Sequence, residues 1–191
     1  NIFKMSFDTK RFTYVLEQDT QEKRSNFKEF IGKNLSTFTP RYDVTLRYER
    51  ETALEKLKKV ADNGFISVFD FERDPLNVFA AHEVCGMIDA SFTTKLTVQF
   101  NLFGGTLIKL GGKRHRDLLP KIDTLDAVGC FGLTELGYGN NAVEMETTAH
   151  YDANTKEWII NTPTTLAQKY WITNGAVHAK WALVFAQTFV S

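Results

Sequence analysis

Cysteine, proline and histidine are scarce in this chain of 191 residues, which contains two cysteines, four prolines and four histidines. The cysteines, Cys85 and Cys130, are far apart and form no CxxC motif, so they predict neither a zinc site nor a disulfide framework. We expect two buried free thiols, as in proteins of reducing compartments. The histidines show no metal-ligand spacing, and we therefore expect no metal site.

An excess of charge and a long apolar run are also missing. The 23 Lys and Arg residues balance 23 Asp and Glu residues, which argues against a general nucleic-acid binder, because such proteins carry a basic excess. The balance still permits a small anionic ligand at one local site. No apolar stretch is long enough to cross a bilayer, so we expect no membrane span. Length and a hydrophobic fraction of 43% are typical of one globular domain, or of one domain plus part of another.

The ends of the chain indicate a piece of a longer protein. The chain begins with Asn1 rather than Met and shows no charged-then-apolar leader. It ends in an apolar segment, residues 181–190, that is typical of a buried strand. We therefore expect the last domain to be truncated.

Residues 1–125 predict a helical domain. Helices are expected over residues 20–32, over 47–62, and from Asp74-Pro75, where Asp74 can cap and Pro75 can occupy the first turn. The third helix carries an apolar stripe formed by Val78, Phe79, His82 and Cys85. We interpret His82 as a core histidine.

Two further segments of this domain are less regular. Threonines favour strand within residues 91–110, but apolar residues recur there at helical spacing, so we predict a helix. Residues 113–119 predict a short basic helix that Pro120 ends. Its basic run, residues 113–116, is either a solvated helix face or a patch that steers anionic phosphates.

Residues 126–191 predict strands. Short apolar runs over 128–134, 147–151, 157–161 and 181–190 are separated by turn residues, including a turn over 152–155. The fold class is therefore α+β: an all-helical domain, residues 1–125, followed by the first part of an antiparallel β-barrel-like domain, residues 126–191.

Two segments could carry chemistry. Residues 129–141 (GCFGLTELGYGNN) run from a strand into a loop rich in glycine and asparagine, which is either a ligand-binding loop or a plain surface turn. The spacing of the glycines is not the dinucleotide fingerprint. Residues 169–175 (KYWITNG) place two aromatic residues before a hydroxyl residue and a turn. They form either an ordinary aromatic strand end or a flat platform for a planar heterocycle.

Together these segments resemble the acyl-CoA oxidase and acyl-CoA dehydrogenase superfamily, most closely the oxidases. The resemblance is carried by residues 129–137 (GCFGLTELG), 146–152 (ETTAHYD), 160–163 (INTP) and 169–172 (KYWI). The Thr-Glu-Leu-Gly form at 134–137 is that of the oxidases. The Trp-Ile-Thr-Asn-Gly form at 171–175 is that of the dehydrogenases.

The resemblance implies FAD as cofactor and an acyl-CoA thioester as substrate. It places Phe131, Leu133 and Thr134 at the pyrimidine edge of the flavin, with the Trp171 ring against the flavin and Thr173 near the flavin N5 atom. The full cofactor-binding set that it implies is Phe131, Leu133, Thr134, Gly139, Trp171, Ile172 and Thr173. Gly139 and Asn140 match the junction between flavin and CoA and are the expected substrate-binding residues.

The implied reaction oxidises acyl-CoA to trans-2-enoyl-CoA, with dioxygen as electron acceptor and hydrogen peroxide as product. The family's catalytic base is a Glu in a C-terminal domain outside this chain, so no catalytic residue is expected here, and Glu135 is not the base. The resemblance further implies a homodimer and a peroxisomal enzyme, with the mitochondrion as the alternative. The rival functions are a dehydrogenase that passes electrons to a flavoprotein and a non-catalytic acyl-CoA-binding fragment.

Overall fold

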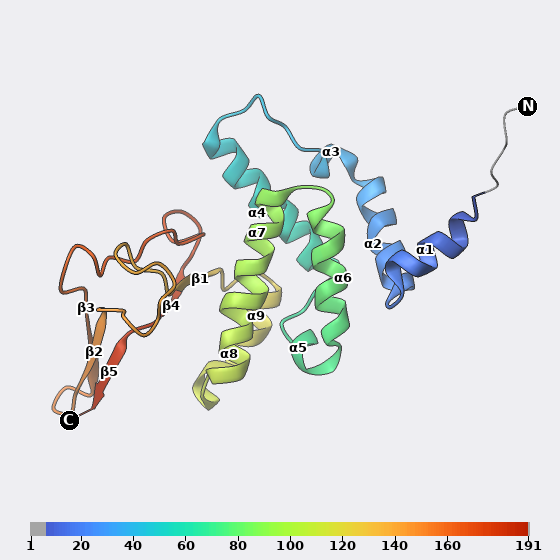
Figure 1. Cartoon of the computed structure of the whole chain (residues 1–191). Coiled ribbons are helices and arrows are strands. Elements are labelled where there is room, and N and C mark those ends of the chain that lie inside the picture. The colour runs from blue at the N-terminus through green and yellow to red at the C-terminus, as the bar shows by residue number, and fades with distance from the viewer. Residues whose placement is uncertain (1–6, 191) are drawn as a thin grey trace, which may run out of the picture. The chain divides into compact units, whose positions relative to one another are not determined.

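The computed structural model describes residues 7–190, in which helices precede strands (Figure 1). The chain divides into two compact units, one up to Leu96 and one from Thr97. The helices of the first unit are α1 (Thr9–Glu17), α2 (Gln21–Lys33), α3 (Leu35–Phe38), α4 (Leu46–Asp62), α5 (Asp70–Arg73), α6 (Pro75–Gly86) and α7 (Ala90–Leu96). The second unit contains the π-helix η1 (Thr97–Gly104), α8 (Gly105–Leu110), the 3-10 helix η2 (Lys113–Leu118), α9 (Leu119–Asp123) and all the strands.

In the first unit, local sequence determines where helix α4 begins, where it ends and which face it buries. Thr45 caps the helix by accepting a hydrogen bond from the Tyr48 N–H at 3.3 Å. Gly64, at a φ of +69°, follows its last turn, as the sequence predicts. Leu57 and Val60 are fully buried, so the apolar face faces the core.

Helix α6 begins at Pro75, as predicted, but the Asp74 side chain does not cap it and instead accepts a hydrogen bond from Lys23 Nζ. The buried face of α6 also differs from the predicted stripe. Val78 and Cys85 are buried, whereas Phe79 is 63% exposed. The small residues Ala80 and Ala81 pack inward in its place. The stripe was therefore wrong at Phe79, because close helix packing favours alanine over a bulky ring at that angle. His82 is half-buried, and its Nδ1–H donates to the Val78 carbonyl at 2.7 Å.

The ambiguous segment 91–110 is helical, which confirms the prediction, but its middle is the π-helix η1. Gln99 of η1 is fully buried. Its amide nitrogen donates to the carbonyls of Ile122 at 3.1 Å and Ala127 at 2.9 Å. The Gln99 side chain thus links η1 to α9 and to the residues just before strand β1.

Pro120 does not end the short basic helix as predicted. Residues 113–118 form the 3-10 helix η2, and Pro120 lies in the first turn of α9. A proline is tolerated there because the first backbone N–H groups of a helix have no intrahelical partner. Lys113, Arg114 and Arg116 are exposed, as expected for a solvated helix face.

The strands form two small sheets. In the first, β1 (Gly129–Gly132) pairs parallel with β4 (Trp181–Val184). In the second, β2 (Thr148–Asp152) pairs antiparallel with β3 (Glu157–Asn161) and parallel with β5 (Gln187–Val190). The α+β class is confirmed, but the pairing is mixed rather than antiparallel throughout. Within residues 7–190 the two sheets do not close into a barrel.

The long apolar run 181–190 is divided between these sheets. The break falls at Phe185 and Ala186, so β4 and β5 pair with different strands. Within residues 7–190, each of the two is an edge strand with one neighbour. No described helix is long and apolar enough to cross a membrane.

Both cysteines are buried and free, as predicted. Burial raises the pKa of the Cys85 thiol far above its ordinary value and also raises that of Cys130. Buried thiols with raised pKa values are poor nucleophiles, because the thiolate is the reactive form.

Candidate functional site

The two segments that the sequence singled out lie side by side in the second unit. The Tyr170 N–H donates to the Thr134 carbonyl at 3.0 Å, and the Thr134 hydroxyl donates back to the Tyr170 carbonyl. One pair further along, the Leu136 N–H donates to the Gln168 carbonyl at 2.9 Å. The fold therefore joins segments 129–141 and 169–175 into one short antiparallel ladder.

Glu135 lies at the centre of this ladder. The residue is 2% exposed, and it pairs with Lys169 across the strands. Its Oε1 atom accepts from Lys169 Nζ at 2.9 Å and from the Thr147 N–H at 3.0 Å, and Oε2 accepts from the Glu146 N–H at 2.8 Å. One carboxylate thus binds two other segments of the chain, at residues 146–147 and at Lys169.

The surroundings of Glu135 keep it ionised. Burial by itself raises the pKa of this carboxyl, but hydrogen bonds from Thr147, from the Glu146 N–H and from Lys169 favour the charged form more strongly. The resulting pKa is lowered to about 2. A group that is charged at every physiological pH is suited to holding structure through ion pairs and hydrogen bonds.

Trp171 is presented outward by an unusual backbone. Its φ is +62°, in the left-handed region that non-glycine residues rarely adopt, and the residue is 83% exposed. Backbone strain of this kind concentrates at functional sites. The turn that follows is fixed by Asn174, whose φ is +69° and whose buried amide donates to the Gly129 carbonyl at 3.2 Å.

The other predicted site residues differ in exposure. Phe131 is half-buried and packs on Phe185, with ring centroids 4.8 Å apart. The remaining predicted residues with half-buried side chains are Leu133, Thr134, Ile172 and Thr173. Gly139 and Asn140 are exposed. The second unit thus contains the whole predicted set, and the ladder directly joins Thr134 with the residue before Trp171.

The loop that carries Gly139 folds back on Glu135. The Glu135 N–H donates to the Gly139 carbonyl at 2.9 Å, and the Gly139 N–H donates to the Glu135 carbonyl at 2.8 Å. Gly139 has a φ of +59°, which explains why glycine stands there. The Tyr138 and Thr164 hydroxyls both donate to the Glu146 carboxylate, whose pKa is lowered by these hydrogen bonds.

Glu135 and Lys169 were missed as a pair by the sequence analysis, which treated their segments separately. The available signal was the presence of one acidic and one basic residue within two otherwise weakly charged segments.

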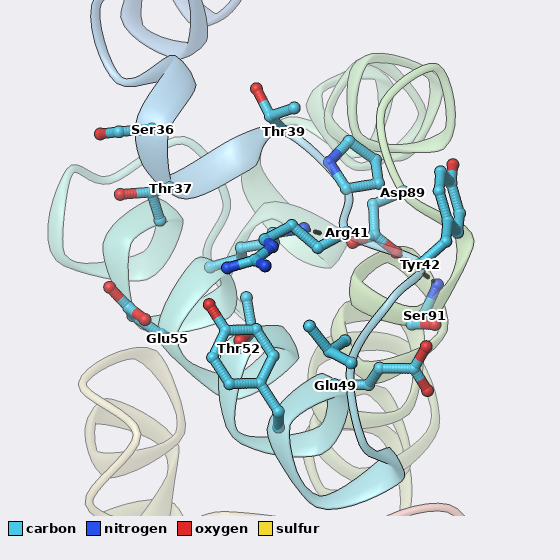
Figure 2. A pocket seen from close by; sticks show the side chains of 14 residues that line it. Ser36, Thr37, Thr39, Arg41, Tyr42, Glu49, Thr52, Glu55, Asp89 and Ser91 are labelled. Atoms are coloured by element: carbon cyan, nitrogen blue, oxygen red, sulfur yellow. Dashed lines mark hydrogen bonds and ion pairs between the residues drawn. The ribbon is translucent and has the colours of Figure 1, made fainter.

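A cavity of about 350 Å³ in the first unit was also not predicted (Figure 2). Figure 2 shows the Arg41 side chain extended across it. Lys56, which is 2% exposed, forms an ion pair with Asp89 in its wall. The lining is rich in hydroxyl and charged groups, including Thr37, Thr52 and Ser91. Such a lining favours water or a polar ligand over an acyl chain. Among the described residues, no group of three His, Cys, Asp or Glu side chains could hold a metal ion.

No family model matches the chain, but curated relatives do. Acyl-coenzyme A oxidase 2, peroxisomal, of Arabidopsis thaliana is 42% identical over 88% of this chain, and the match covers 24% of that protein. The putative peroxisomal acyl-coenzyme A oxidase 3.2 of the same plant is 40% identical over 78% of this chain and is covered over 23%. Human peroxisomal acyl-coenzyme A oxidase 3 is 35% identical over 88% of this chain, with 24% covered.

Solved structures give the same result. Acyl-CoA oxidase 3 of Yarrowia lipolytica matches with a TM-score of 0.80 and 27% identity, over 97% of this chain and 27% of its own. A glutaryl-CoA dehydrogenase of Mycobacterium smegmatis in complex with FADH2 matches with a TM-score of 0.70 and 28% identity, over 95% of this chain and 45% of its own. These matching structures are thus an acyl-CoA oxidase and a glutaryl-CoA dehydrogenase, each similar to this chain over nearly the chain's whole length.

The chain is homologous to proteins named acyl-CoA oxidases over most of its own length. It spans about a quarter of the length of the curated relatives it matches. The resemblance read from the motifs is thereby confirmed.

Proposed function

We propose that the protein that contains this chain is an FAD-dependent acyl-CoA oxidase of peroxisomal fatty-acid β-oxidation. The observation that carries the proposal is the ladder that joins Thr134 to Tyr170 and presents the exposed Trp171 beside it. Two relatives at 40% and 42% identity are peroxisomal acyl-CoA oxidases by name, and they support both the activity and the compartment.

The residues present fit a flavin. A planar heterocycle with polar edges needs a flat apolar wall and nearby hydrogen-bonding groups. Trp171 offers an exposed indole, Thr173 offers a hydroxyl, and the Thr134 hydroxyl, which donates to the Tyr170 carbonyl, can still accept a hydrogen bond. An acyl-CoA oxidase of Caenorhabditis elegans with FAD bound matches this chain with a TM-score of 0.74 and 25% identity.

FAD, when bound, supplies the redox chemistry that the protein side chains lack. In this proposal Phe131, Leu133 and Thr134 bind its pyrimidine edge, Trp171 and Ile172 pack against the ring, and Thr173 hydrogen-bonds near N5. Gly139 and Asn140 bind the substrate where the thioester continues into CoA. The task of this chain is thus to bind and orient, and the base that takes the α-proton lies in another part of the protein.

Because the flavin-binding residues and the catalytic base lie in different parts of the protein, this chain by itself should be inactive. Residues 1–191 supply the loop and the tryptophan wall but not the base, so we propose that they do not turn over acyl-CoA alone. We also propose a domain boundary at residue 125 and a homodimer of the whole protein. Lys113, Arg114 and Arg116 of the basic run 113–116 are exposed, which is compatible with steering of CoA phosphates.

A second candidate function is an acyl-CoA dehydrogenase. It is favoured by the Trp171-Ile172-Thr173 form and by the match to glutaryl-CoA dehydrogenase. The two candidates differ in the electron acceptor, which for an oxidase is dioxygen.

The test is turnover of a saturated acyl-CoA by the purified full-length protein in air. An oxidase forms hydrogen peroxide and 2-enoyl-CoA in roughly equal amounts without any added acceptor. A protein that forms 2-enoyl-CoA only when an artificial electron acceptor is added is a dehydrogenase. A protein that forms none under either condition contradicts both functions.

A further inference from the structure

We propose that Glu135 and Lys169 are positioning residues that clamp the two flavin-facing segments at a fixed spacing. The inference rests on the proposed function, and it assigns to this ion pair a task beyond the contacts that the flavin itself makes.

Lys169 binds two residues of the opposite segment, Leu133 and Glu135, which lie on either side of Thr134. Its Nζ donates to the Leu133 carbonyl at 3.1 Å as well as to Glu135 Oε1 at 2.9 Å. These two contacts bracket Thr134 on its own segment. Lys169 is itself two residues before Trp171. A shift of the ammonium group therefore moves the backbone on both sides of the proposed flavin site.

Glu135 is held in place by backbone groups of a third segment. Its carboxylate accepts the Glu146 and Thr147 N–H groups, which lie just before strand β2. Thr147 is 1% exposed, and its hydroxyl donates to the Ala167 carbonyl at 3.2 Å. The Glu135 carboxylate is therefore fixed by buried backbone groups. Because the Lys169 ammonium binds that carboxylate, its position is fixed as well.

The ion pair lies close in sequence to Trp171, so the distance between segments 129–141 and 169–175 affects where Trp171 is held. Trp171 holds a left-handed backbone and is exposed, so packing around its ring does not hold it in place. Tyr170, the residue before Trp171, pairs with Thr134 in the ladder. Lys169, the residue before Tyr170, pairs with Glu135. Placement errors of about 1 Å at a reacting centre can cost about a hundredfold in rate, so a site built on two loops gains from a rigid link between them.

The Lys56–Asp89 ion pair provides a matched control in the first unit. Like the clamp, it joins a lysine to a carboxylate and has one almost fully buried partner, which is Lys56 here and Glu135 in the clamp. It lies outside segments 129–141 and 169–175. Loss of either pair should destabilise the fold, but only loss of the clamp should alter flavin binding.

The test uses the full-length protein with FAD. The decisive variant is the double substitution Glu135→Gln and Lys169→Met, which leaves no unpaired buried charge and so keeps the fold testable. We expect FAD affinity to fall by about tenfold or more and the visible flavin absorption bands to shift. We also expect amide hydrogen exchange at Tyr170 to become faster even without FAD, because its N–H bond to Thr134 loosens.

Three comparisons complete the test. Lys169→Arg should retain FAD affinity within about threefold, because a guanidinium keeps the charge and can reach the same acceptors. Exchange of the partners, Glu135→Lys with Lys169→Glu, should not rescue binding, because the Glu146 and Thr147 N–H groups would then face a cation. Lys56→Met with Asp89→Asn should lower the unfolding temperature and leave FAD affinity within about twofold of wild type.

The clamp is overturned if the Glu135→Gln and Lys169→Met double variant binds FAD as tightly as wild type with unchanged spectrum and exchange. It is also overturned if the Lys56 and Asp89 control loses FAD to the same extent, because the effect is then general destabilisation. A wild-type protein that binds no FAD overturns the proposed function, and the clamp as a flavin-positioning device with it. The wild-type measurement thus separates the two failures.

Discussion

The side-chain carbonyl of Gln99 accepts a hydrogen bond from the backbone N–H of Gly129 at 3.1 Å, where the helical run meets the first strand. Gln99 is fully buried and makes two further bonds, to the carbonyls of Ile122 and Ala127. This amide therefore fixes the start of the segment that leads to Thr134.

Gln99→Leu should lower the free energy of unfolding by at least about 1–3 kcal/mol, because a nearly isosteric apolar residue leaves buried backbone groups without partners. Urea unfolding measures the change. Thr94→Val on helix α7 is the control, since its exposed hydroxyl bonds only to the Ala90 carbonyl within the same helix. Equal stability of the Gln99→Leu variant and wild type would contradict the importance of this junction.

Gly129→Ala should destabilise the chain by about 1–3 kcal/mol through overpacking. A Cβ at this position would lie 2.2 Å from the Phe103 ring, so the ring or the strand must move. Gly32→Ala in helix α2 is the matched control, because nothing lies within 4 Å of its Cβ and alanine is the better helix former. Thermal unfolding should show opposite signs for the two variants, and a neutral Gly129→Ala would contradict the packing described here.

Glu135 should make stability depend on acidity. Its folded-state pKa is about 2 against an ordinary value of 4.5, so its stabilising contribution is fully present above pH 4.5. The contribution is lost as the pH falls from about 4.5 through about 2, because the unfolded state takes up the proton first. Urea unfolding between these values should show a steeper loss for wild type than for Glu135→Gln. Parallel curves would show that the carboxylate is not held as described.

Thr134→Val and Thr173→Val should each weaken FAD retention in the full-length protein. A lost buried hydrogen bond costs about 1–3 kcal/mol, which corresponds to roughly a fivefold to hundredfold weaker affinity. Fluorescence titration of the apoprotein with FAD measures the loss, and Thr155→Val in the turn before β3 serves as an exposed control. Normal FAD content and normal reduction rates in both variants would mean that the flavin ring is wrongly placed.

Local signals account for the parts of the fold that the sequence predicted well. The start of α6 depends on Pro75, the start of α4 on the Thr45 cap, and strand β3 on the turn residues just before it, all of which are local signals. The exposure of Phe79, by contrast, depends on how closely the neighbouring helices pack against α6, which local sequence does not reveal. The placement of Pro120 was missed because a proline can start a helix as readily as it can end one.

Pairing between distant segments could not be predicted in the same way. Strands β1 and β4 are parallel although both were expected in an antiparallel arrangement, because strand direction is decided by connections far apart in sequence. The Glu135–Lys169 pair was missed for the same reason, since it joins residues that no local pattern relates. The chemistry of the two segments was identified only through their joint resemblance to a family, and the residue roles within them stay predictions.

The most direct test of the account is anaerobic addition of a saturated acyl-CoA to the full-length protein purified with FAD. The account predicts that the protein is yellow, that the visible flavin absorption is lost on addition of substrate, and that it returns with hydrogen peroxide when air is admitted. A protein that contains no flavin, or whose flavin absorption is unchanged by acyl-CoA, would contradict the central claim that segments 129–141 and 169–175 form the flavin wall of an acyl-CoA oxidase.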